Sequence, residues 1–138
     1  MAANVSAGDV VSERGVRFAR RVFTAAGIYG MLVLPPMLFL ETRIGIETPP
    51  PITHSEFFYG FLGVAIAWQF AFVVIGRDPI RYRPLMPATW VEKFSYGVAT
   101  VVLFQQGRIP PAVLAFGLLD SVLGVLFVAS WWWTRERR

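Results

Sequence analysis

The feature that most constrains this chain is a series of long segments without charged residues. Residues 22–40 form one such run of 19, and residues 57–76 form another of 20. Residues 109–134 form a third, of 26, in which Asp120 is the only charged residue. A helix of about 20 apolar residues crosses the roughly 30 Å hydrocarbon core of a bilayer. These runs therefore predict an all-α integral membrane protein.

A fourth span is predicted less directly, because residues 94–107 provide only 14 uncharged positions. The segment reaches a full span if its helix starts near Pro87, since proline is favoured in a first helical turn. Glu92 and Lys93 then fall in the headgroup zone, where an acid complements the helix dipole and a lysine can snorkel to the interface. We expect a four-transmembrane-helix bundle in a single domain, residues 1–138, with spans at about 22–40, 57–76, 87–107 and 110–133.

Basic residues give the orientation. Four spans place the polar N-tail (1–20), the central loop and the basic C-tail (134–138) on one side of the membrane. That side carries 11 of the 13 basic residues and leaves Arg43 and Arg108 on the other. Lys and Arg near span ends are biased to the cytoplasm. We therefore expect both termini to be cytoplasmic, and we assign the net charge of +4 to topology rather than to a nucleic-acid partner.

Composition and motifs argue against several kinds of site. The chain has no cysteine and one histidine, so thiolate and histidine metal sites are not expected. No phosphate-binding glycine loop or nucleophile elbow is present, and the glycines are scattered through apolar segments. No cofactor is evident, and an enzymatic role is not the first expectation.

The sharpest chemical feature is Asp120, near the middle of the last span. An acid at the bilayer centre costs roughly 2.5–3.5 kcal/mol, so it normally faces the bundle interior. Counting inward from the span ends places Tyr29, Gln69 and Tyr96 at a similar depth. We expect a buried polar site in which Asp120 is hydrogen-bonded to Gln69 and Tyr96. This site either pins the helices together or binds a small ligand or proton.

The central loop combines Arg, Asp, Tyr and Pro in a pattern unlike a simple solvated basic run. One interpretation is a fixed hairpin in which Asp78 pairs with an arginine and Tyr82 anchors at the interface. A second is that Arg81 and Arg83 bind anionic lipid headgroups. A third is that the loop, from Arg77 onward, docks a partner subunit.

Two further patterns concern helix packing and the outer connection. Small residues four apart occur at Ala26 and Gly30, at Gly63 and Ala67, and at Gly117 and Ser121. Such pairs let helices approach closely in lipid, either within one bundle or in a homodimer. Pro35 and Pro36 predict a kink or an early end to the first span. We expect residues 41–55 to form the outer loop, and its three prolines at 49–51 favour a stiff, extended segment.

Several segments carry a family resemblance. Residues 77–84, RDPIRYRP, together with Glu92-Lys93 and Leu119-Asp120, resemble small uncharacterised bacterial four-helix membrane proteins that are broadly DoxX-like. The resemblance covers about residues 57–133. It implies a four-helix bundle in a bacterial cytoplasmic (inner) membrane, and it provides no catalytic residue to transfer.

The sequence leaves three functional hypotheses. The first is an accessory or structural subunit without a catalytic motif, in a larger membrane complex or a homodimer. The second is a binding protein or isomerase for a hydrophobic ligand, such as a lipid or isoprenoid, with Asp120, Gln69 and Tyr96 lining the cavity. A proton-coupled transporter is the third, and it is weakened by the single acid at the midplane.

Overall fold

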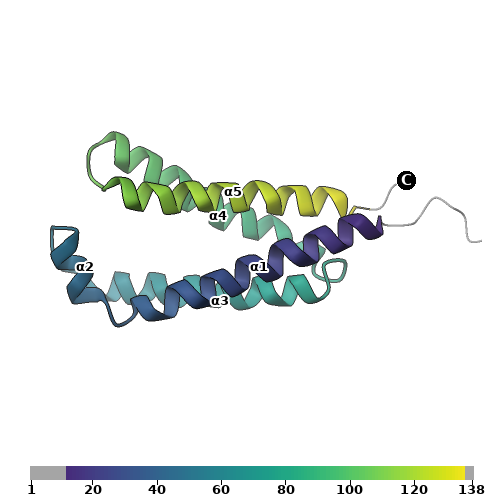
Figure 1. Ribbon diagram of the computed structural model, residues 1–138, viewed down its shortest axis with the longest axis horizontal. Helices are drawn as coiled ribbons and strands as arrows, with labels where there is room; N and C mark the ends of the chain where they lie inside the picture. Colours follow the sequence, from purple (N-terminus) through teal and green to yellow (C-terminus); the bar gives the residue numbers. More distant parts are fainter. Residues whose placement is uncertain (1–11, 136–138) are drawn as a thin grey trace, which may run out of the picture.

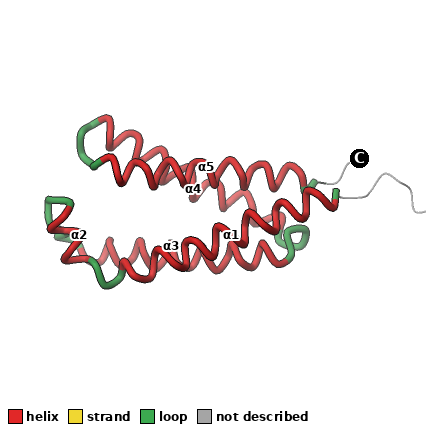
Figure 2. The backbone as a smooth tube through the Cα atoms, viewed as in Figure 1, coloured by secondary structure: helices red, strands yellow, loops and turns green. Residues whose placement is uncertain are grey.

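The computed structural model describes residues 12–135, in which helices joined by short loops and turns are present and no strand occurs (Figures 1 and 2). The prediction of an all-α fold is confirmed. The elements are α1 (Glu13–Met37), α2 (Glu41–Glu47), α3 (Ser55–Arg77), the short 3-10 helix η1 (Arg83–Leu85), α4 (Met86–Gln105) and α5 (Pro111–Trp133).

The four long helices form two packed pairs. Helix α1 lies along α3, and α4 lies along α5, while the contact between α1 and α5 joins the pairs. Figure 1 shows that the pairs meet where α1 begins and α5 ends, which we call the narrow end. They diverge toward α2 and the α4–α5 turn, which we call the wide end. The bundle is therefore open along part of its length.

Two helices, α3 and α5, are long and apolar enough to cross a membrane. Helices α1 and α2 satisfy the same criterion only together, and the chain bends by 86° between them. Residues 12–135 thus contain two or three candidate membrane-spanning helices and are consistent with a membrane protein.

Helix α1 begins earlier than the sequence predicts. Glu13 starts it, inside the segment expected to be a polar tail, because Gly15, Ala19 and Phe23 form a buried stripe at four-residue spacing. The helix ends at Met37 rather than 40, directly after Pro35 and Pro36. The prediction of an early helix end is confirmed. Residues 1–11 and 136–138, which include the rest of both predicted tails, lie outside the described residues.

The expectation that residues 41–55 form a loop is wrong for its first half, which is helix α2. Its prolines begin only at Pro49, after the helix has ended, so they do not interrupt it. The carboxylate of Glu41 accepts hydrogen bonds from Ser55 Oγ and from the hydroxyl of Tyr59, the latter at 2.9 Å. These bonds tie the start of α2 to the first turns of α3.

The core fills the narrow half of the bundle. Phe23 of α1 stacks on Phe127 of α5 with ring centroids 4.3 Å apart, and Phe72 of α3 lies 5.0 Å from Phe127. All three side chains are fully buried. This aromatic contact joins the two helix pairs through three different helices.

Small residues bring the helices within each pair together. A Cβ atom placed on Gly27 of α1 would lie 2.8 Å from the carbonyl oxygen of Gln69 and 2.7 Å from Val73 Cγ2, both on α3. Gly117 of α5 likewise approaches Thr100 of α4. By contrast, a Cβ on Gly63 would meet no neighbouring helix within 4 Å in the described structure. The predicted pairs at Ala26 and Gly117 thus pack within the bundle, and the pair at Gly63 does not.

The Gly27 contact can be tested by overpacking. We expect Gly27→Leu to lower the free energy of unfolding by about 1–3 kcal/mol, because the backbones of α1 and α3 must separate. Gly63→Leu is the matched control on the exposed face of α3 and should change it by no more than about 0.5 kcal/mol. Thermal unfolding in detergent, followed by tryptophan fluorescence, measures both. Equal destabilisation by the two variants would contradict the close approach at Gly27.

Candidate functional site

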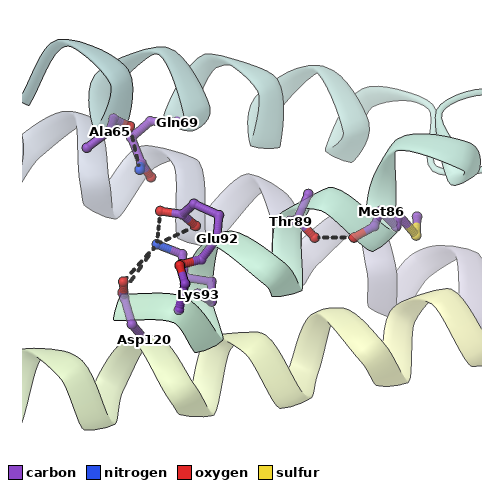
Figure 3. Close-up of polar contacts among 8 residues, drawn as sticks. Ala65, Gln69, Met86, Thr89, Glu92, Lys93 and Asp120 are labelled. Carbon is purple, nitrogen blue, oxygen red and sulfur yellow. Dashed lines mark hydrogen bonds and ion pairs between the residues drawn. The ribbon is translucent and has the colours of Figure 1, made fainter. Parts of the chain in front are cut away.

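A buried ammonium group lies at the centre of the bundle. Lys93 of α4 is 5% exposed, and its Nζ lies 3.2 Å from both carboxylate oxygens of Asp120 on α5. The same Nζ lies 3.3 Å from Glu92 Oε2 and 3.4 Å from Glu92 Oε1. Figure 3 shows the two carboxylates converging on one ammonium. We call Glu92, Lys93 and Asp120 the ion cluster.

The ion cluster lies near the middle of both of its helices. Lys93 is the eighth of the 20 residues of α4, and Asp120 is the tenth of the 23 residues of α5. The ammonium also lies 5.2 Å from the ring centroid of Phe72 on α3. The cluster therefore links α4 to α5 and contacts the opposite helix pair.

A cavity of about 720 Å³ opens between the two pairs on the wide side of the ion cluster. Its walls come from all five α-helices and are mainly apolar. They include Leu34, Leu40, Val64, Trp68, Phe116 and Leu119. On α1 and α3 the lining residues begin where the aromatic core ends: Ala26 follows Phe23 by one turn, and Gln69 precedes Phe72 by one turn. The ion cluster therefore lies at the inner end of the cavity, next to the core.

The four residues predicted for the buried site, Asp120, Gln69, Tyr96 and Tyr29, all line this cavity. Their predicted hydrogen-bonded cluster does not form. Gln69 Nε2 donates instead to the carbonyl of Ala65 in its own helix, at 2.9 Å. The ring of Tyr96 stacks on Phe61 of α3, with centroids 6.0 Å apart. The four residues thus share one cavity, but their position along the helices did not identify their hydrogen-bond partners.

The expectation for Glu92 and Lys93 is wrong, because Lys93 points into the bundle rather than toward a headgroup zone. Two signals in the sequence were available. Lys93 is the only lysine in the chain, in which the other 12 basic residues are arginines. It also shares a helical face with Thr89, Gly97 and Thr100, all of which are buried. A lone lysine on a stripe of small residues indicates an inward-facing ammonium.

The central loop is a fixed structure at the narrow end. Arg83 Nη2 donates to the carbonyl of Trp131 at 3.2 Å, and its guanidinium lies 4.6 Å from the Trp131 ring centroid. Asp78 accepts the backbone N–H of Arg81 at 3.1 Å rather than pairing with an arginine side chain. Tyr82 packs against the core. Arg83, Asp78 and Tyr82 are thus structural, whereas Arg77 and Arg81 are exposed.

Residues 12–135 contain no group of three His, Cys, Asp or Glu side chains that could hold a metal ion. The chemistry that the site offers is recognition by charge and hydrogen bonds at one end of an apolar cavity. No protein-family model, characterised protein or solved structure matches this chain. The resemblance to DoxX-like proteins stays a prediction.

Removing the ammonium should leave two carboxylates without their cation. We expect Lys93→Met to lower the free energy of unfolding by about 3 kcal/mol or more, because an uncompensated buried charge is costly. Adding Asp120→Asn should recover part of this loss, since one of the two charges is then gone. Thermal unfolding in detergent measures both variants.

Arg17→Met is the control for loss of a cation. Arg17 pairs with Glu13 on the surface, with 59% of its side chain exposed, so its loss should cost less than about 1 kcal/mol. Unchanged stability in Lys93→Met would show that the bundle does not need the ammonium.

Proposed function

We propose that this protein is a four-span protein of the bacterial inner membrane that binds a hydrophobic ligand in the cavity between its two helix pairs. The observation that carries the proposal is the cavity itself, about 720 Å³ of mainly apolar walls with a few polar groups at one end. Ligand sites in proteins are typically clefts of about 300–1,000 Å³ with this composition. A lipid or an isoprenoid has the chemistry to fill it.

The shape of the bundle favours ligand binding over the accessory-subunit hypothesis. A polar cluster that only pins helices would be enclosed by packing on every side. Here the side chains of Glu92 and Asp120 are 21% and 20% exposed and line the cavity. Ligand binding accounts for these features, and the structural-subunit role stays a prediction.

The four-span topology is supported by helix length and by the distribution of charge. Helices α1 and α4 have 25 and 20 residues, which correspond to about 38 and 30 Å. The charges that make α4 look too polar to span, Glu92 and Lys93, lie within the ion cluster. Both described chain ends and the central loop lie at the narrow end, which we assign to the cytoplasm (Figure 1). The exposed Arg77 and Arg81 would then face anionic headgroups there.

Topology can be tested with single cysteines, because the natural chain has none. We expect a membrane-impermeant maleimide to label Thr53→Cys and Gln106→Cys in intact cells, and to label Arg81→Cys only after the membrane is opened. All three positions are exposed. Gln106→Cys is the decisive variant. If it is protected in intact cells while Thr53→Cys is labelled, α4 does not cross the membrane.

Ligand binding can be tested by filling the cavity. Val33 lines it, whereas Val98 of α4 is 63% exposed and does not. We expect native mass spectrometry after gentle-detergent purification to show a retained lipid-sized mass on the wild type and on Val98→Trp. Val33→Trp should lose that mass, because the indole occupies the space of the ligand. Equal retention by both tryptophan variants would place the bound molecule elsewhere and contradict the proposal.

A further inference from the structure

We infer that the polar end of the ligand is a protonated amine, carried on an apolar body without an anionic group. This inference rests on the proposed function and specifies the ligand of the same cavity. It follows from the charge balance of the ion cluster, from the exposure of its side chains and from the aromatic and apolar residues of the cavity walls.

The ion cluster holds more negative than positive charge. Two carboxylates share one ammonium, and the lining of the cavity contains no arginine, histidine or second lysine. An ammonium has three hydrogens to donate, while the two carboxylates present four oxygens. Glu92 Oε2 lies 3.3 Å from Nζ, but it is buried and accepts no hydrogen bond from the described residues. A second cation beside the two acidic side chains would balance the charge.

All three residues of the ion cluster line the cavity, but the two acidic side chains are more exposed than the lysine. The Lys93 side chain is only 6% exposed, whereas Glu92 and Asp120 are 21% and 20% exposed. A ligand that enters therefore meets more of the acidic side chains than of the lysine. An amine would find hydrogen-bond acceptors of opposite charge, whereas a fatty acid or phosphate would face like charge in a low-dielectric site.

The walls around the cluster also suit a cation on an apolar body. Aromatic rings line the cavity on all four of its long helices, at Tyr29, Phe61, Trp68, Tyr96 and Phe116. The faces of such rings attract cations, most strongly where water is excluded. Leu34, Val64 and Leu119 offer apolar surface for an alkyl chain or a ring system.

The experiment compares three probes with the same alkyl chain and different head groups: hexadecylamine, hexadecanol and hexadecanoic acid. They compete for the full-length protein in nanodiscs of zwitterionic lipid, and native mass spectrometry counts each bound species. We expect the amine to bind the wild type roughly tenfold or more tightly than the alcohol, since hydrogen bonds to charged groups are the stronger ones. The acid should bind most weakly, and Val33→Trp should abolish binding of the amine.

Two variants test whether the carboxylates cause the preference. Asp120→Asn and Glu92→Gln each leave one carboxylate opposite Lys93, so either should reduce the preference for amine over alcohol toward equality. Glu56→Gln removes an acid with 69% side-chain exposure outside the cavity and should leave the preference unchanged. Because the two cluster variants act on different helices, one that fails to fold leaves the other as the test.

The outcomes separate the two proposals. If alcohol or acid binds as tightly as amine and Val33→Trp still blocks binding, the inference about the head group is overturned and the ligand site stands. The alcohol would bind as tightly as the amine if a bound proton neutralised the excess charge of the ion cluster. If none of the three probes binds in a manner that Val33→Trp blocks, the proposed function itself is overturned.

Discussion

The position of α4 in this bundle depends on the ammonium of Lys93. Without a partner, that charge could not lie 5% exposed at the centre of an apolar fold. Asp120 on α5 provides the partner at 3.2 Å, so the two charges account for each other's burial. The contact also explains how a segment with only 14 consecutive uncharged residues can pack in the interior of an apolar bundle.

The open half of the bundle follows from where small and large residues lie. Glycines draw α1 to α3 and α4 to α5 along most of their lengths, as at Gly27 and Gly117. Between the pairs, Gly15 of α1 approaches the backbone of Trp133 on α5, and the rings of Phe23, Phe72 and Phe127 pack together. This aromatic cluster lies only in the narrow half. Beyond it no comparable core joins the pairs in the described structure. The helices thus pack closely within each pair, but the two pairs pack against each other only in the narrow half. The cavity is the space left between the pairs in the wide half.

The sequence predicts the fold class and three of the long helices to within a few residues, because uncharged runs and prolines mark their limits. It also places Asp120, Gln69, Tyr96 and Tyr29 at one depth. Their partners were not predictable in this way, since depth along a helix does not say which way a side chain points. Gln69 bonds to its own helix, and Asp120 bonds to a lysine that was expected at the interface. Helix α2 was not predicted, because the three prolines at 49–51 led us to expect a loop over the seven helical residues before them as well.

Stability does not by itself explain why the ion cluster is present. Replacing a buried ion pair by well-packed apolar residues is often neutral or stabilising, because desolvation offsets most of the attraction. One carboxylate, that of Asp120, would be enough to join α4 to α5 through Lys93. Glu92 nevertheless places a second carboxylate beside the same ammonium. The excess negative charge of the ion cluster lies where the cavity meets the core, and the two acidic side chains are more exposed than the lysine. Two carboxylates beside one buried ammonium are costly for folding. A cationic ligand in the cavity would neutralise their excess charge, and this accounts for their presence.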